Sequence, residues 1–116
     1  MLFICYPKCS TCQKAKKWLD EHNIEYTERY IVENNPTYDE LRDWYSKSGL
    51  PLKKFFNTSG LLYKEMNLKD KLSAMSEEEQ LELLATNGML VKRPLVISKD
   101  IVLVGFKEAE WNRIIY

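Results

Sequence analysis

The apolar positions near the start of the chain change from a continuous run to a helical spacing. Residues 2–6 form a short apolar run before Pro7, as expected for a buried strand. Over 11–21, apolar side chains recur three and four residues apart, which predicts an amphipathic helix. A second strand is predicted over 25–32, where apolar and polar residues alternate. The helical stripe contains Cys12, Ala15, Leu19 and His22, and the alternating positions are Tyr26, Tyr30 and Val32. Together these elements predict a βαβ unit with parallel strands.

The middle of the chain carries the start and stop signals of helices. Thr37–Glu40 is a capping-box pattern before an apolar stripe that ends at Gly49. Ser76–Glu79 is a second capping box, and Asn87-Gly88 closes the helix that follows it. We expect short helices and turns over 50–68.

The last third returns to strand patterns and then ends in a helix. Two short apolar runs, 95–97 and 101–104, are separated by the turn residues 98–100, which predicts a β-hairpin. Residues 108–116 are predicted to be helical. The resulting order is βαβ, a helical block, then ββα. This order predicts one α/β domain over 1–116, with a core formed by 1–33 and 91–116 and an all-helical insertion at about 34–90.

Composition and charge restrict the class of protein. Seventeen basic and seventeen acidic side chains cancel in a chain of 116 residues, so we expect no direct nucleic-acid partner. The apolar start is too short for a signal-peptide core or a membrane span, which favours a cytoplasmic protein without a membrane partner. Three cysteines are few and odd in number. Redox or metal chemistry therefore fits them better than a secreted disulfide scaffold.

The segment from Tyr6 to Cys12 contains the candidate chemistry. Cys9 falls at the end of the predicted strand-to-helix loop, and Cys12 falls in the first helical turn. Unpaired N–H groups at a helix start favour a thiolate, and Lys8 adds a nearby cation. We therefore predict that Cys9 is a nucleophile and that Cys12 resolves the mixed disulfide that Cys9 forms.

Three alternatives remain open from the residues alone. A structural zinc site normally needs four ligands. Beyond the Cys9 and Cys12 pair, the only further candidate ligands that we consider are Cys5 and His22, so we expect no metal. The two cysteines could instead be inert, although their place in a βαβ unit argues against this. A mechanism with one cysteine, in which Cys12 only packs inward, is the third alternative. Cys5 itself is interpreted as a small buried residue.

Arg93-Pro94 precedes the predicted hairpin and is the second candidate constellation. Judged alone, Pro94 is interpreted as an ordinary trans proline at the start of a strand. An arginine at position 93 could hold an anion or a thiolate beside Cys9.

The segments Cys9-Ser10-Thr11-Cys12 and Val91-Lys92-Arg93-Pro94, in this order of elements, resemble the ArsC family over essentially the whole chain. The similarity is to the branch of ArsC-like and Spx/MgsR-like proteins. The family implies a thioredoxin/glutaredoxin-like fold with a small mixed four-stranded sheet. It implies that Pro94 is cis and shapes the thiol site, and that Arg93 lies next to the reactive sulfur. It also implies a nucleophile at Cys9.

Two activities follow from the resemblance. The family's arsenate reductases bind oxyanion with three arginines, of which Arg93 matches one. The second position falls near Lys53, which we retain as a weak anion-binding candidate, and the third falls near 105–107, where no arginine stands. Arsenate is therefore the less favoured substrate, because lysine lacks the fork geometry of arginine. A glutaredoxin proper is not matched around Pro94.

Spx-type regulators use a Cys-x-x-Cys switch and bind the α subunit of RNA polymerase, and Gly49 is the nearest candidate for their contact glycine. We therefore predict a thiol–disulfide oxidoreductase acting through Cys9 and Cys12, and leave open whether the chain is an enzyme or a redox-switched regulator. The expected partners are a thiol reductant (glutathione, glutaredoxin or thioredoxin) or the polymerase α subunit. No bound cofactor is expected, although glutathione is a candidate reductant.

Overall fold

Residues 1–115, the part of the chain that the computed structural model describes, contain four short strands in one sheet of order β2-β1-β3-β4. The strands are β1 (Leu2–Cys5), β2 (Thr27–Tyr30), β3 (Leu95–Ile97) and β4 (Val102–Val104). The α-helices are α1 (Ser10–Glu21), α2 (Tyr38–Ser48), α3 (Leu61–Glu65), α4 (Leu68–Lys71), α5 (Glu77–Thr86) and α6 (Glu108–Ile115). Short 3₁₀ helices are η1 (Leu52–Phe55), η2 (Leu72–Ala74) and η3 (Gly88–Leu90). Tyr116, predicted to belong to the last helix, lies outside the described residues.

The central strand β1 pairs in both directions. It runs parallel to β2, with Leu2 opposite Thr27, and antiparallel to β3, with Leu2 opposite Ile97. β3 and β4 form the expected antiparallel hairpin. The prediction of an α/β fold with a mixed four-stranded sheet is therefore confirmed, and the parallel βαβ unit places the β1–α1 loop at one end of the sheet.

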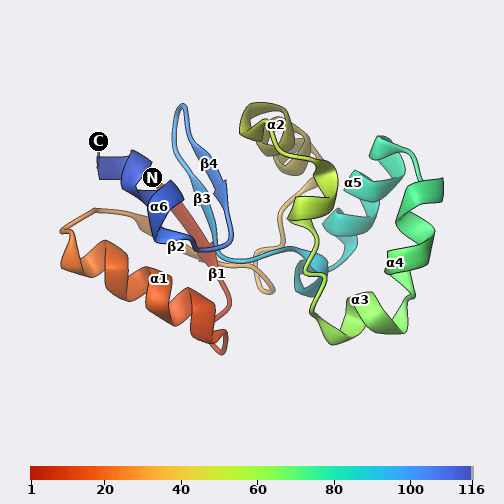
Figure 1. Cartoon of the computed structure of the whole chain (residues 1–116), viewed down its shortest axis with the longest axis horizontal. Helices are drawn as coiled ribbons and strands as arrows, with labels where there is room; N and C mark the ends of the chain where they lie inside the picture. Colours follow the sequence, from red (N-terminus) through yellow and green to blue (C-terminus); the bar gives the residue numbers. More distant parts are fainter. Residues whose placement is uncertain (116) are drawn as a thin grey trace.

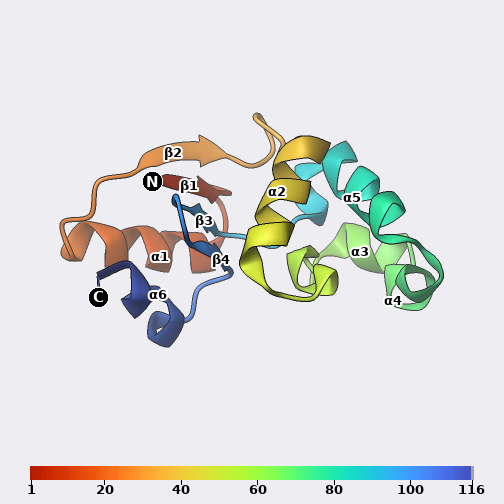
Figure 2. The same ribbon diagram turned by 90° about the horizontal axis from the view of Figure 1, so that it is seen from above.

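Alternate residues of β1 pack on opposite faces of the sheet. Phe3 and Cys5 belong to a core shared with α1 and with Trp111 of α6, whereas Ile4 belongs to the core of the helical insertion. Figures 1 and 2 show α1 and α6 beside the sheet at one end of the molecule and helices α2 to α5 at the other. The N-terminus and the last helix, α6, lie on the sheet side (Figure 1).

The capping signals are confirmed at both long helices of the insertion. The Thr37 hydroxyl accepts from the Glu40 N–H and the Glu40 carboxylate accepts from the Thr37 N–H, and the same pair of bonds joins Ser76 and Glu79. Gly49 ends α2 in the left-handed region. Among residues 1–115, no helix is long and apolar enough to span a bilayer.

Two details of the predicted apolar pattern differ in the structure. The second strand is shorter than the predicted 25–32, and Ile31, which directly follows it, is buried while Tyr30 and Val32 are exposed. The stripe of α1 also buries Trp18, whereas His22, the C-cap residue, is exposed. The indole of Trp18 packs edge-on against Trp111, and the His22 ring lies over Trp18 at the helix end.

Candidate active site

A tight turn carries the chain from β1 into α1. The Cys9 N–H donates to the Tyr6 carbonyl at 2.9 Å, and Pro7 occupies the second position of this turn, where its fixed φ is favoured. Cys9 has an extended backbone and is the N-cap residue of α1, so the helix starts one residue later. The turn therefore positions the Cys9 sulfur beside the unpaired N–H groups of the first helical turn.

The surroundings of Cys9 favour its thiolate. Partial burial alone would raise the pKa of the Cys9 thiol. Hydrogen bonding outweighs burial and lowers this pKa below its usual value; the groups involved are the N–H and thiol of Cys12, the Arg93 side chain and the Thr11 N–H. A half-buried sulfur with a lowered pKa is the condition for a reactive cysteine.

Cys12 has the opposite character. Its side chain is buried on the inner face of α1, and burial raises the pKa of its thiol to about 12, although the Tyr6 N–H opposes this effect. That N–H donates to the Cys12 sulfur at 3.4 Å. The two thiols of the pair therefore differ: Cys9 is accessible and acidic, whereas Cys12 is enclosed and protonated at neutral pH.

Arg93 and Pro94 lie across the loop from the cysteines. The Arg93–Pro94 bond, which the resemblance implies to be cis, is cis in the structure. The Arg93 guanidinium carbon lies 4.9 Å from the centre of the Tyr6 ring. Its Nε and Nη1 atoms are buried and meet no hydrogen-bond partner among residues 1–115. A guanidinium with two unused donors beside a thiolate is suited to hold an anion there.

The two predicted lysines lie at different places. Lys8 is exposed in the turn, and the main groups that lower the Cys9 pKa are Cys12, Arg93 and Thr11 rather than Lys8. Lys53 is exposed in η1 and lines a groove that Thr11 also lines. The structure thus brings Cys9, Cys12 and Arg93 together, with Lys53 on a neighbouring surface.

Cys5 is buried, as expected, and lines a small cavity of about 150 Å³ that Cys12 also lines. Burial and the nearby Glu28 carboxylate raise the pKa of the Cys5 thiol to about 11. This shift makes Cys5 a poorer nucleophile than Cys9 at neutral pH. Within residues 1–115, no three His, Cys, Asp or Glu side chains gather as a metal site would require.

Sequence reasoning missed Tyr6, which contributes two contacts to the site. Its ring supports Arg93, and its N–H contacts the Cys12 sulfur. The available signal was its position as the first residue after β1, directly before Pro7. Three further lysines that line the groove with Lys53 were also missed: Lys54, its neighbour in the chain, and Lys92 and Lys107, which are distant from it in the sequence.

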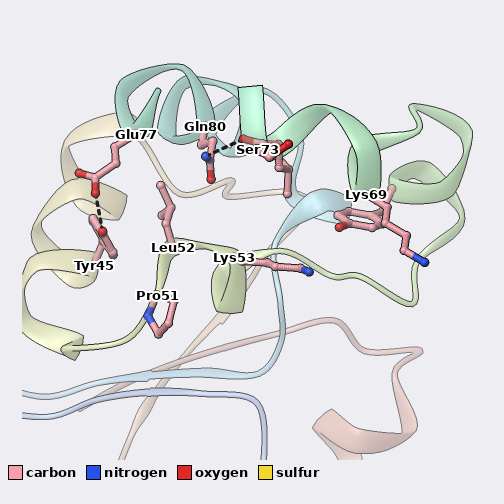
Figure 3. A pocket seen from close by; sticks show the side chains of 10 residues that line it. Tyr45, Pro51, Leu52, Lys53, Lys69, Ser73, Glu77 and Gln80 are labelled. Atoms are coloured by element: carbon pink, nitrogen blue, oxygen red, sulfur yellow. Dashed lines mark hydrogen bonds between the residues drawn. The ribbon is translucent and has the colours of Figure 1, made fainter. Parts of the chain in front are cut away.

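A separate cavity of about 410 Å³ lies inside the helical insertion, and residues of the thiol loop do not line it. Figure 3 shows its wall, where the Tyr45 hydroxyl donates to the Glu77 carboxylate at 2.9 Å. The cavity shares Pro51 and Lys53 with the groove that Thr11 lines, but Cys9, Cys12 and Arg93 do not line it.

A thiol at the start of a helix, opposite a cis-proline segment on a mixed four-stranded sheet, defines the thioredoxin-like class of proteins. The chain belongs to the ArsC family, whose model matches residues 5–114. The family prediction is therefore confirmed.

The relatives include proteins of different functions. The chain is 60% identical to the uncharacterized protein YusI of Bacillus subtilis (strain 168), over 97% of this chain and 95% of YusI. It is 31% identical to the regulatory protein MgsR of the same organism, over 95% of this chain and 86% of MgsR.

Solved structures agree with the fold. A putative ArsC family related protein from Bacteroides fragilis superposes with a TM-score of 0.96 at 65% identity, covering 97% of this chain and 95% of that one. A possible arsenate reductase from Streptococcus mutans UA159 gives 0.90 at 42% identity, covering 99% of this chain and 97% of that one. The relatives of this chain therefore include both a possible arsenate reductase and a regulatory protein.

Proposed function

We propose that this protein is a thiol–disulfide oxidoreductase that acts through Cys9 and Cys12. The observation that carries the proposal is the contrast between the two sulfurs. Cys9 is half-buried, has a lowered pKa and lies beside Arg93, whereas Cys12 is buried and protonated next to it. A reactive first thiol and a protected second thiol are what a two-step exchange requires.

The exchange proceeds in two balanced steps. The Cys9 thiolate attacks one sulfur of a substrate disulfide, forms a mixed disulfide and expels the other half as a thiolate, which takes up a proton. The Cys12 thiol then loses its proton and attacks the Cys9 sulfur, which releases the second half of the substrate. The Cys9–Cys12 disulfide forms, and two electrons have passed from the protein to the substrate. An external thiol reductant, such as glutathione, glutaredoxin or thioredoxin, restores the two thiols in the cytoplasm.

Turnover of a small disulfide tests this proposal. We expect the wild-type protein to reduce 2-hydroxyethyl disulfide with glutathione as the reductant. The Cys9→Ser variant should have no activity in this assay. Cys12→Ser should form a trapped mixed disulfide at Cys9, visible as an added mass in the intact protein. Arsenate is included as an alternative substrate. If wild type and Cys9→Ser are equally inert toward all of these substrates, the enzyme proposal fails.

Regulation is a second candidate function, favoured by the 31% identity to the regulatory protein MgsR. In this case the Cys9–Cys12 pair would act as a redox switch for binding to the α subunit of RNA polymerase. Gly49 is exposed at the end of α2, and no atom of residues 1–115 outside its chain neighbours lies within 4 Å of the position its Cβ would take. A pull-down with the C-terminal domain of the α subunit tests this, with oxidised and reduced protein compared. Absence of binding in both redox states would reject the regulator function.

A further inference from the structure

The second step of the proposed exchange needs a group that takes the proton of Cys12. Burial raises the pKa of this thiol to about 12, so little thiolate is present at neutral pH. The negative charge of the Cys9 thiolate raises it further, and this contribution ends when Cys9 enters a mixed disulfide. Burial, the largest cause, remains. Cys12 must therefore pass its proton to a base as it attacks the Cys9 sulfur.

The cavity of about 150 Å³ that Cys12 lines also contains a base. Its walls come from β1, α1 and β2, and Glu28 is the sole carboxylate among the described residues that line it. Cys12 is 2% exposed, whereas the Glu28 side chain is 25% exposed. The cavity therefore joins a buried thiol to a carboxylate that can exchange protons with solvent.

Three groups hold the Glu28 carboxylate at the wall of this cavity. The Lys16 Nζ of α1 lies 3.0 Å from its Oε2, and the Tyr30 hydroxyl of β2 donates to its Oε1 at 3.2 Å. The Cys5 thiol of β1 faces Oε2 at 3.9 Å. Lys16, Tyr30 and Cys5 line the same cavity, so the carboxylate is fixed there by groups from all three elements.

Water can carry the proton between Cys12 and Glu28. A bound water needs a hollow of about 10–15 Å³ and roughly two to four polar partners. The cavity is larger than this, and Cys12, Glu28 and Gln13 supply polar groups along it. The Tyr6 N–H, which donates to the Cys12 sulfur at 3.4 Å, is placed to stabilise the negative charge that develops there as the proton leaves.

We propose that Glu28 is the proton acceptor for Cys12 in the resolving step, acting through water in this cavity. The inference rests on the proposed exchange and adds the base that its second step requires. Cys12 gives its proton to a water molecule, which gives one to the Glu28 carboxylate. The Cys12 sulfur bonds to the Cys9 sulfur, and the substrate half leaves Cys9 as a thiolate with the electron pair of the broken bond. Glu28 then returns the proton to solvent.

The reagent 5,5′-dithiobis(2-nitrobenzoate) separates the two steps, because attack by Cys9 and resolution by Cys12 each release one coloured thiolate. One equivalent is mixed with the reduced protein in a stopped-flow instrument. Glu28→Gln should slow the second release about 10- to 100-fold at pH 7 and change the first by less than about twofold. Cys12→Ser should show the first release alone, which assigns the two phases.

The pH profile of the second release distinguishes a base from a structural residue. The titratable groups that interact with Glu28 are Lys16, Cys5, Tyr30 and Tyr26, and the pKa of each is raised, that of Cys5 to about 11. They therefore keep their charge between about pH 6 and 8.5. Over this range the wild-type rate should change little. The Glu28→Gln rate should rise about tenfold per pH unit, because the thiolate fraction of Cys12 then controls it.

Three further variants complete the test. Glu28→Asp keeps a carboxylate and should retain more of the second release than Glu28→Gln. Added formate should restore the second release in Glu28→Ala, whereas neutral formamide should not. Glu21→Gln is the matched control, since Glu21 pairs with Lys17 on α1 but does not line the cavity, and it should change neither release.

The direction of the effect is itself informative. Removal of a negative charge near Cys12 favours its thiolate, so electrostatics alone would speed the second release in Glu28→Gln. A second release in this variant as fast as that of wild type, or faster, would overturn the assignment of Glu28 while the exchange stands. A wild-type rate that rises tenfold per pH unit would also overturn it, because Cys12 would then lose its proton directly to solvent. A wild type that releases one thiolate only would reject the two-cysteine exchange itself, which is a separate result.

Discussion

The Tyr6 ring lies beneath the guanidinium of Arg93, with the Arg93 Cζ 4.9 Å from the ring centre. Tyr6 directly follows β1 and Arg93 precedes β3, so this contact joins the two segments that flank Cys9. The Nε and Nη1 atoms of Arg93 are buried and have no hydrogen-bond partner among the described residues. The cation–π contact with Tyr6 partly offsets the cost of burying this charge. We interpret Tyr6 as a positioning residue that holds Arg93 toward the Cys9 sulfur.

Tyr6→Leu should therefore raise the pKa of Cys9, because Arg93 loses the ring that orients it and hydrogen-bonds the thiolate less well. A cation–π contact contributes about 0.5–2 kcal/mol, which corresponds to a rise of up to roughly 1.5 pKa units. The pH dependence of Cys9 alkylation by iodoacetamide, followed by mass spectrometry, measures this pKa. Tyr6→Phe keeps the ring and is the control. An identical pH profile for the Leu and Phe variants would show that the ring does not act through Arg93.

In the wild type, the three cysteines should be alkylated in a fixed order. Cys9 should react first near neutral pH, since its pKa lies below the usual value. Cys12 and Cys5 should react only when pH approaches about 12 and about 11, because their thiols stay protonated below those values. Site-resolved labelling rates from pH 5 to 9 measure this difference. Equal rates for Cys9 and Cys5 would remove the case for an activated thiol.

The sequence predicted those parts of this site that are near one another in the chain. The strand-to-helix position of Cys9 follows from local patterns, and so do the capping boxes at Thr37 and Ser76. Arg93 and the cis Pro94 came from the family resemblance, because no local rule links them to residue 9. Tyr6 and the groove lysines could not be predicted, since their positions arise when β1, η1 and the β4–α6 loop meet in three dimensions. The edge position of β2, which exposes Tyr30, is also a property of the assembled sheet.

Mild oxidation should join Cys9 to Cys12 and leave Cys5 reduced. Cys9 supplies the thiolate, and Cys12 is the thiol that hydrogen-bonds to it, whereas the Cys5 thiol faces Glu28 at 3.9 Å. Peptide mapping after treatment with stoichiometric diamide would identify the bridge. A disulfide that contains Cys5 would contradict the assigned pair. Cys5→Ala is the control, and it should form the same Cys9–Cys12 bridge.

The ion pair between Arg29 of β2 and Glu40 of α2 should make stability depend on acid pH. Two contacts, Nη1 to Oε2 at 2.7 Å and Nη2 to Oε1 at 2.9 Å, join the guanidinium to the carboxylate. Hydrogen bonding from Arg29 lowers the pKa of Glu40 from 4.5 to about 2. Since the folded-state pKa is depressed, this contribution to stability is complete above pH 4.5 and is lost as pH falls toward 2.

Glu40→Gln should therefore lower the free energy of unfolding by about 1–2 kcal/mol at pH 7, discounted for the partly exposed carboxylate, and by much less at pH 2. Urea denaturation at the two pH values measures the difference. Glu79→Gln is a matched control, because Glu79 holds the same capping-box position in α5 without an arginine partner. Equal losses for the two variants at pH 7 would assign the effect to capping rather than to Arg29.

Gly88 should tolerate no side chain, because a Cβ there would overlap the Ile31 carbonyl and lie 2.9 Å from the Asn35 Oδ1. Both neighbours are held in place: Ile31 donates its N–H to the Cys5 carbonyl at 2.8 Å, and Asn35 donates to the Ala85 carbonyl at 2.9 Å. Gly88→Ala should therefore cost about 2–4 kcal/mol, since backbone must move to make room. Gly49→Ala is the comparison, because Gly49 has a φ of +69° but open space around its Cβ position.

The comparison separates steric overlap from backbone strain. Gly49→Ala should cost about 1 kcal/mol through the left-handed conformation alone. The Gly88 overlap lies where the segment after β2 meets the start of η3, and β2 pairs with the strand that leads to Cys9. We therefore expect Gly88→Ala, and not Gly49→Ala, to speed alkylation of Cys12, because loosening this junction lets solvent reach the buried thiol. Thermal melting and labelling rates measured on the same samples test both parts. If the Gly88→Ala variant were as stable as Gly49→Ala, the backbone at Ile31 would be shown to shift at little cost. The thiol site would then not depend on the packing at Gly88.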